Sequence, residues 1–580
     1  MKKEALLSYL YRFFDIIILL FIVFDFGYDF HENYNTPHIV GLILLTVGLL
    51  AFNSFKYFIY TFKSNKKVVL INMVLLSILL IICVIIWFVN RNFPAYYIFQ
   101  RIKPALEGGL IFYFLLRLMV FVRHIYDIYF NPAIVFVGSF MILVLIGAFL
   151  LMLPSATTNG ITFTNALFTA TSAVCVTGLT VVDTAADFNI VGQSIIIVLI
   201  QLGGIGILTF TSFFAFFFRS SSSFKEGLNT RDFIANDGLK DVFRAALNVV
   251  IFTLFVELLG AIFIYSSIID NPKIENEIYF SIFHSISAFC NAGFSIIPGG
   301  IVNETVRFNY YFQWILMTMI ILGGLGHNIV FNFFHYLKTY IVELFGKKII
   351  HKKIRIITLN TKIVIYTTII LLVGGSIFLF ISEYNHTLLE HETIFGKITS
   401  ASFNAVSPRT AGFSAVNYAD MGVPSLLFII FLMWIGGSPA STAGGIKTST
   451  FALATLNIIA VARGKSRIQL FGRRITADST SRAFAILSIS LISIGVSIMA
   501  VLIFEPEGTP LLTVAFECFS AYSTVGSSIN YTATLTEPSK YVIIMTMFIG
   551  RIGMLNLMVG LLRRLNHQFY EYPRENILIN

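Results

Sequence analysis

Long apolar segments alternate with short polar ones along most of the chain. From about residue 130 onward the alternation follows a fixed order that occurs four times. A long apolar segment is followed by a short amphipathic one, a glycine-centred loop and a second long apolar segment. Because apolar helices of about 20 residues match the hydrocarbon thickness of a bilayer, the pattern predicts an all-α polytopic membrane protein.

Each repeated unit is predicted to have an outer helix, a re-entrant helix, a loop and an inner helix. Outer helices are expected at 133–153, 242–268, 362–382 and 483–504. The short segments are too short to span a bilayer and therefore predict re-entrant helices, at 163–175, 278–290, 392–405 and 510–523. Inner helices are expected at 190–218, 310–340, 425–460 and 540–564.

Glycines mark the same two places in every unit. The loop glycines, Gly178, Gly293, Gly412 and Gly526, are 115, 119 and 114 residues apart. A second glycine cluster lies in each inner helix, beginning at Gly203, Gly323, Gly436 and Gly550. Two landmarks in one phase predict four pseudo-symmetric helix–pore-loop–helix units around one axis, where a pore can lie. The expected boundaries are 129–235, 236–350, 351–470 and 471–580, the last including a tail.

The first 128 residues predict a separate membrane domain of about four helices, with apolar segments near 12–30, 38–60, 67–89 and 106–123. No small-residue cleavage site follows the basic start, so we interpret the first segment as a retained helix. Arg117 and Arg123 in the fourth segment invite a voltage-sensor interpretation. Their spacing lacks a regular every-third pattern, which favours a structural or assembly role.

Composition agrees with a membrane location. Apolar residues make up 57% of the chain and charged residues only 12%, against about 25% charged in soluble domains. The net charge of +10 comes largely from the linkers between units and from the tail, while the alternate loops are acidic. By the positive-inside rule, both termini are expected in the cytoplasm, and the basic residues orient the chain in the cell membrane rather than bind nucleic acid.

Four cysteines, Cys83, Cys175, Cys290 and Cys518, show no metal-site or redox spacing. We expect them to act as small packing residues.

The glycine loops have the properties of an ion filter. Backbone carbonyls can replace the water shell of a cation if the chain is extended and the carbonyls point inward. Glycine favours the backbone angles that this requires. A single loop of this kind more often serves close helix packing. Four loops in phase, each after a non-spanning segment, favour a filter.

Four runs carry a resemblance to a known family: TSAVCVTGLTVVD at 171–183, FCNAGF at 289–294, SPRTAGFS at 407–414 and GGSPASTAGGIKT at 436–448. They resemble the Trk/Ktr/HKT superfamily of potassium uptake proteins, over about residues 130–565, and the bacterial Ktr and Trk membrane subunits most closely. The resemblance implies potassium-selective uptake across the cytoplasmic membrane through a channel-like pore with one filter glycine per unit. Since related plant transporters with serine at the first filter position favour sodium, Gly178 implies a preference for potassium.

By that resemblance the transported ion is K⁺ and the chain is not an enzyme and has no organic cofactor. The expected filter residues are Val176, Thr177, Gly178, Asn291, Ala292, Gly293, Thr410, Ala411, Gly412, Thr524, Val525 and Gly526. The expected partners are a second copy of the chain, a cytoplasmic nucleotide-binding regulatory ring and membrane lipids.

A helix-breaking segment interrupts the third inner helix. Glycine is a poor helix former and proline removes a backbone donor, so an unwound loop below the filter is expected. Its residues are Gly436, Gly437, Ser438, Pro439, Ala440, Ser441, Thr442, Ala443, Gly444, Gly445 and Lys447. Arg551 lies at a similar expected depth, where an arginine must pair or face water. The hypothesis is a gate in which Arg551 pairs with the loop; the alternative is a kink whose free carbonyls Arg551 stabilises.

Parts of the pattern are also compatible with other functions. A sodium- or proton-coupled cation symporter remains open, as does an alternating-access carrier of a small solute, although such carriers more often have two halves than four like units. A membrane enzyme would need paired ionisable groups inside the helices, whereas His284, His327 and Glu257 stand alone in the sequence. No phosphate-binding glycine motif lies in a strand–helix context, so nucleotide binding by this chain itself is not expected.

Overall fold

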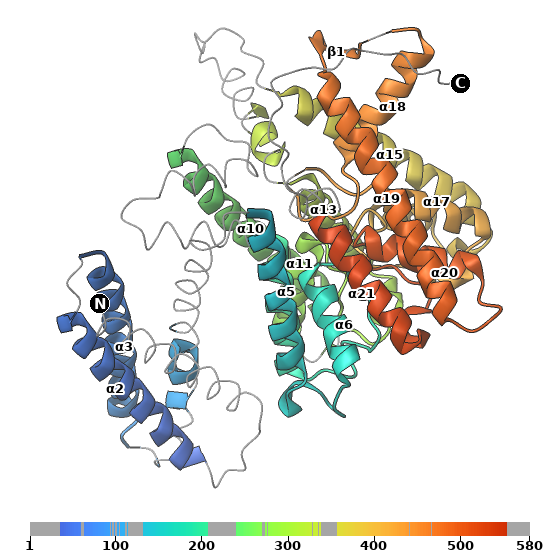
Figure 1. Ribbon diagram of the computed structural model, residues 1–580. Helices are drawn as coiled ribbons and strands as arrows, with labels where there is room; N and C mark the ends of the chain where they lie inside the picture. Colours follow the sequence, from blue (N-terminus) through green and yellow to red (C-terminus); the bar gives the residue numbers. More distant parts are fainter. Residues whose placement is uncertain are drawn as a thin grey trace, which may run out of the picture.

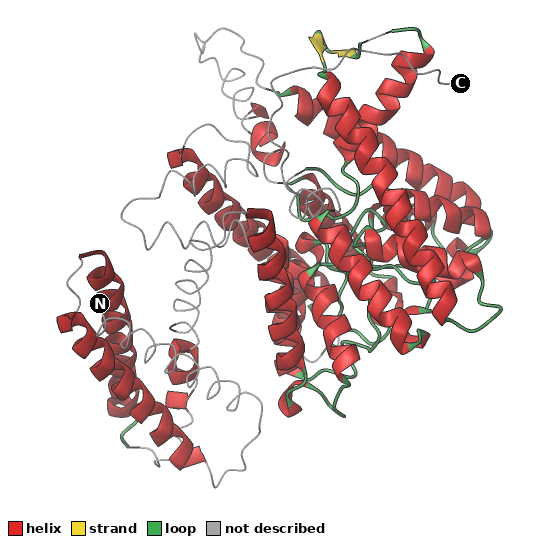
Figure 2. Cartoon of the chain, viewed as in Figure 1, coloured by secondary structure: helices red, strands yellow, loops and turns green. Residues whose placement is uncertain are grey.

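Helices make up nearly all of the regular structure (Figures 1 and 2). The computed structural model describes residues 35–59, 63–92, 132–206, 239–269, 276–326, 357–439, 441–465 and 467–553, with shorter stretches between 94 and 113, at 273–274 and between 329 and 337. In these ranges the only strands are β1 (Gln469–Leu470) and β2 (Arg473–Arg474), which form one short antiparallel pair. The chain is therefore all-α, as the apolar segments predict.

Four long outer helices lie close to their predicted positions: α5 (Pro132–Leu151), α10 (Leu239–Ile268), α15 (Leu359–Glu383) and α19 (Ala477–Phe504). Of the helices that the structure describes, α3 (Lys63–Val89), α10, α15 and α19 are long and apolar enough to cross a membrane. Large apolar side chains such as Leu258, Ile370 and Ile503 remain exposed on them. Exposed apolar surface of this extent is what contact with lipid requires.

The four re-entrant segments are short helices: α6 (Phe163–Val174), α11 (Glu277–Cys290), α16 (Ile394–Val406) and α20 (Leu511–Tyr522). With 12 to 14 residues each, they are about 18–21 Å long, well short of a hydrocarbon core of about 30 Å. Thr162, Asn276 and Thr393 cap the first three by accepting a backbone N–H. These caps explain why the helices begin where they do.

The inner helices are α7 (Ile190–Ile205), α13 (Tyr310–Leu325), α17 (Val423–Trp434) with α18 (Thr448–Ala462), and α21 (Glu537–Ile552). The predicted interruption of the third one is confirmed, since no helix runs between Trp434 and Thr448.

The prediction of uninterrupted inner helices in the other units is wrong. α7, α13 and α21 each end one residue before a glycine with positive φ, namely Gly206, Gly326 and Gly553. Helical residues resume at 329 after the second of these breaks. Glycine weakens a helix by about 1 kcal/mol relative to alanine and adopts positive φ without strain, so hydropathy alone overestimated the length. The predicted extensions at 207–218, 338–340 and 554–564 lie outside the described residues.

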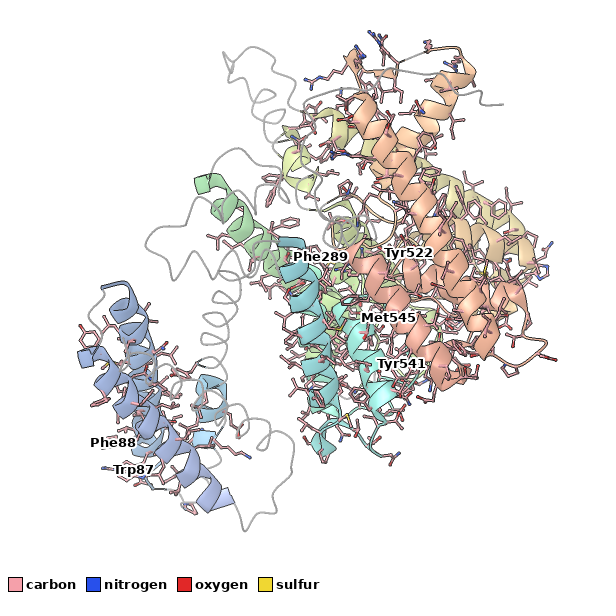
Figure 3. All side chains as sticks on the ribbon, in the orientation of Figure 1. Trp87, Phe88, Phe289, Tyr522, Tyr541 and Met545 are labelled. Carbon is pink, nitrogen blue, oxygen red and sulfur yellow. The ribbon has the colours of Figure 1, made fainter. Side chains whose placement is uncertain are left out.

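The units are joined in a closed cycle. In the first, second and fourth units the re-entrant helix packs against both the outer and the inner helix, whereas in the third unit α16 packs against the outer helix α15. Between units, each inner helix packs against the re-entrant helix of the next unit, through the pairs α7–α11, α13–α16, α17–α20 and, closing the cycle, α21–α6. Lys540 on α21 donates to the Asn165 amide oxygen on α6 at 3.0 Å. Figure 3 shows Tyr541 at the same junction, where its hydroxyl lies 3.1 Å from that of Thr164.

The N-terminal segment has a core of its own. α2 (Asn35–Ile59) and α3 pack side by side, close to two of the predicted apolar segments. Leu42, Leu76 and Leu110 are buried between them and the residues that follow. The segment predicted at 12–30 lies outside the described residues, as do Arg117 and Arg123. The voltage-sensor interpretation and its structural alternative therefore stay predictions from the sequence.

Candidate functional site

The four loop glycines form one closed ring of backbone contacts. A Cβ atom placed on Gly178 would lie 3.1 Å from the Cα atom of Gly293, and one on Gly293 would lie 3.1 Å from that of Gly412. The same contact joins Gly412 to Gly526 at 3.0 Å and Gly526 back to Gly178 at 2.9 Å. We call these four residues the glycine ring. Its closure requires four units that surround a common centre.

Backbone oxygens fill the space that side chains on these glycines would need. A Cβ atom on the four ring glycines would lie 2.1–2.7 Å from the carbonyl oxygens of, in chain order, Ala292, Ala411, Val525 and Thr177. Real Cβ atoms do not approach so closely, and the obstacle is backbone rather than a flexible side chain. Glycine is therefore required at all four positions.

The loops hold an uncommon backbone conformation. The ring glycines have φ values of 70° to 93°. The residues two positions before them also have positive φ, although none is glycine: Val176 at 55°, Asn291 at 60°, Thr410 at 90° and Thr524 at 49°. Positive φ is a genuine outlier for β-branched residues such as valine and threonine. Strain of this kind persists where the surroundings impose it, and it concentrates at functional sites.

In each loop the N–H group of the residue before the ring glycine is hydrogen-bonded, whereas among the described residues its carbonyl group has no backbone donor. The N–H groups of Thr177, Ala292, Ala411 and Val525 donate to the carbonyls of Ser172, Ser287, Ser407 and Ser520 at 2.7–2.9 Å. In the part of the chain that the structure describes, the carbonyl oxygens of the same four residues accept no backbone hydrogen bond outside regular elements. Buried carbonyls normally find a partner. A converging set of unbound carbonyls has the chemistry that replaces the hydration shell of a cation.

In two of the loops, a polar side chain of the re-entrant helix is hydrogen-bonded to residues that follow the ring glycine. In the fourth unit, Glu517 accepts from the Ser528 hydroxyl and from the Thr532 hydroxyl at 2.6 Å. In the second unit, His284 Nε2 lies 2.9 Å from the hydroxyl of Ser295. Glu517 and His284 both stand nine residues before a ring glycine, and their serine partners stand two residues after it.

Sequence reasoning missed these supports because their partners become neighbours only when the loop folds back. Glu257, which stands alone in the sequence, accepts a hydrogen bond from the Gln201 amide at 2.9 Å. His327 lies outside the described residues.

The loop between α17 and α18 contacts the second and fourth units as well as its own. We call residues Gly436–Lys447 the intramembrane loop. Its first residue donates to Ile446 O at 2.8 Å, which closes the loop at its base. Ser438 N donates to Gly324 O at 2.8 Å, and the Thr442 hydroxyl donates to Phe289 O at 3.2 Å, both in the second unit. On the returning limb, a Cβ atom on Gly444 would collide with the Thr524 hydroxyl of the fourth unit.

Cationic side chains bind the carbonyls of this loop. Arg551 donates through Nη1 to Thr442 O and through Nη2 to Gly203 O at 2.9 Å, so it joins the loop to the first unit. Lys447 Nζ donates to Ala443 O at 2.6 Å. Every predicted loop residue except Ala440 is described, and Ala440 lies outside the described residues. The structure thus brings Arg551 and the loop together, in a geometry that fits both a gate and a stabilised kink.

A buried histidine of the third unit contacts the second unit. His391 precedes α16, is 1% exposed, and its Nδ1 atom lies 3.0 Å from the Tyr310 hydroxyl. Burial, together with the positive charges of Arg307 and Lys397, lowers the pKa of His391 from 6.5 to about 4. The imidazole is therefore neutral at pH 7.

Comparisons with known proteins agree with this geometry. The family model TrkH, described as "Cation transport protein", matches residues 106–571. "Potassium/sodium uptake protein NtpJ" of Enterococcus hirae is 33% identical over 455 residues, which cover 77% of this chain and 97% of that protein. "Ktr system potassium uptake protein B" of Bacillus subtilis is 34% identical over 429 residues, covering 73% and 91%. The crystal structure of the potassium transporter TrkH from Vibrio parahaemolyticus has the same fold, with a TM-score of 0.60 at 16% identity over 85% of this chain and 97% of that one.

Proposed function

Because this chain belongs to the TrkH family of cation transport proteins, we propose that it takes up potassium across the cytoplasmic membrane through the centre of the glycine ring. In this proposal the twelve residues from Val176–Gly178, Asn291–Gly293, Thr410–Gly412 and Thr524–Gly526 form the selectivity filter. K⁺ is the transported ion. Similar proteins named for potassium uptake support this choice of ion.

One observation carries the proposal: four loops close into one ring, while the carbonyl oxygens before the ring glycines have no backbone partner among the described residues. Non-helical backbone at membrane depth is tolerated where it is buried or lines a water-filled cavity. Each loop follows the C-terminal end of a re-entrant helix, and the negative end of the helix dipole favours a cation nearby. Ring, dipoles and free oxygens all favour a dehydrated cation at the same point.

We further propose that the intramembrane loop is the gate of this pore. It contacts the second and fourth units directly, and Arg551 joins it to the first, so its displacement affects the units around the conduction path. The guanidinium of Arg551 places a positive charge against the loop, which opposes the passage of cations. Opening requires Arg551 to release Thr442 O, and the fourth unit then moves relative to the loop.

The remaining expectations are part of the same proposal. The chain acts as a homodimer with a cytoplasmic nucleotide-binding ring, both termini face the cytoplasm, and the four units follow the boundaries given above, after a membrane domain at 1–128. The word "system" in the names of Ktr relatives supports a partner subunit. The basic linkers between units support the orientation.

Rubidium uptake tests the proposal in cells that lack their own potassium uptake systems. The chain should support uptake that potassium inhibits and sodium inhibits only weakly. Arg551→Gln, and separately a deletion of residues 438–445, should raise the initial rate at equal amounts of membrane-inserted protein. Arg463→Gln, at the distant end of α18, is a control for loss of an arginine. Equal inhibition by sodium and potassium argues against the filter, and unchanged rates in both gate variants argue against the gate.

A further inference from the structure

The third unit differs from the others at a position three residues before the ring glycine. The first, second and fourth units have small neutral residues there, Cys175, Cys290 and Ser523, whereas the third has Arg409. All four positions are buried. The third unit is also the one whose inner helix is interrupted by the intramembrane loop. The arginine therefore occurs in the unit where the standard packing is absent.

In the other three units the inner helix packs directly on the end of the re-entrant helix. A Cβ atom on Gly203, Gly323 or Gly550 would lie only 1.8–2.0 Å from a carbonyl oxygen of the residue that precedes this position. The oxygens belong to Val174, Phe289 and Tyr522. Such close backbone contact holds each inner helix against its own filter loop.

The third unit replaces this contact with a hydrogen bond. Gly436 packs on Gly444 O of its own loop and on the Thr410 side chain, rather than on the re-entrant helix. Arg409 Nη2 donates to Gly436 O at 3.1 Å. Thr410, the next residue, belongs to the filter, and Gly436 opens the intramembrane loop. This bond therefore spans the boundary between the two.

The bond is difficult to replace once it breaks. Arg409 is 8% exposed, and among the described residues no carboxylate forms an ion pair with it. Its Nε atom has no hydrogen-bond partner in the same part of the chain. A buried charge that loses a hydrogen-bonding partner is strongly penalised. Movement of the loop away from the filter would leave both the guanidinium and Gly436 O unpaired.

We propose that Arg409 is a positioning residue that ties the third filter loop to the intramembrane loop and holds that loop in its closed place. The proposal rests on the gate function proposed above. It implies that displacement of the loop pulls on the backbone before Thr410, so that gating and ion preference are coupled. Arg409 and Arg551 bind separate carbonyls of the loop, Gly436 O and Thr442 O.

A double-mutant cycle tests the tether. Rubidium influx is measured for the full-length protein, Arg409→Gln, a deletion of residues 438–445 that retains Gly436, and the combination, at equal membrane abundance. Arg409→Gln should raise influx about three- to tenfold in the intact protein, and change it less than about twofold in the shortened background. The sodium-to-rubidium influx ratio should rise in the intact protein only. Arg307→Gln, at the end of α12 (Glu304–Arg307) and far from the loop in sequence, controls for loss of an arginine.

The outcomes separate the tether from the gate. If the shortened loop alone leaves influx unchanged, the gate is wrong and the tether falls with it. If the shortened loop raises influx but Arg409→Gln acts by the same factor in both backgrounds, the gate stands and the tether is wrong. Should Arg409→Gln fail to reach the membrane, Arg409→Lys takes its place in the cycle. A single ammonium cannot reproduce the planar guanidinium, so unchanged influx in that variant also overturns the tether.

Discussion

Replacing Gly178 by serine should erode the preference for potassium over sodium. The φ angle of Gly178 is +91°, and a Cβ atom would lie 2.3 Å from Ala292 O, whereas ordinary contact begins at 3.4 Å. The oxygen or the new side chain must therefore move by about 1 Å. Positive φ at a non-glycine residue adds about 1–3 kcal/mol of strain. If this energy is relieved by distorting the ring, the preference should fall about tenfold or more, since about 1.4 kcal/mol corresponds to a factor of ten.

The assay is rubidium uptake under increasing sodium, compared between Gly178→Ser and Gly160→Ser. Gly160 has a φ angle of +78°, similar to that of Gly178, but a Cβ atom there would meet nothing within 4 Å. The control thus carries the backbone strain without the collision in the ring. The reasoning is refuted if Gly178→Ser retains the wild-type preference at normal abundance, or if Gly160→Ser loses it to the same extent.

Three further predictions concern packing, pH and loop support. Gly550→Ala should lower the melting temperature in detergent much more than Gly495→Ala, because only the first Cβ atom would collide with backbone, at 1.8 Å; equal effects would contradict this packing. Because the pKa of His391 is lowered in the folded protein, the unfolded chain takes up a proton on this histidine at a higher pH than the folded one does. The free energy of unfolding should therefore decline by up to about 3 kcal/mol as the pH falls from 6.5 to about 4. His391→Gln should make the melting temperature depend less on pH over this range. Glu517→Ala should leave the Ser528 hydroxyl without its acceptor and lower the free energy of unfolding by about 1–3 kcal/mol. It should also weaken the preference for potassium more than Glu517→Gln does. Equal preference in both variants would show that the filter loop does not need this hydrogen bond.

Repetition in the sequence predicted the arrangement of the units. Glycines at one phase, short segments before them and apolar segments around them were sufficient for four like units about one axis. The interruption between Trp434 and Thr448 was also predictable, because consecutive glycines and Pro439 oppose a helix. These are local signals, and their physical meaning does not depend on distant residues.

The missed features depend on contacts between segments far apart in sequence. Arg409 stood in a recognisable motif, but its partner Gly436 lies 27 residues away, across a complete helix. The roles of Glu517 and His284 become apparent only in the folded loops, where the chain turns back and brings their hydrogen-bond partners close. The breaks at Gly206, Gly326 and Gly553 carried a usable signal, since in these three units a glycine recurs three residues after the first glycine of the cluster. Apolar length concealed it, because hydropathy measures membrane affinity and not helix continuity.

An anomalous diffraction map of the protein crystallised in rubidium tests the central claim most directly. The account predicts rubidium on the axis enclosed by the carbonyl oxygens of Thr177, Ala292, Ala411 and Val525, and a weaker peak at that place in Gly178→Ser. Rubidium found only away from the glycine ring, with the ring intact in the same crystals, would contradict the account.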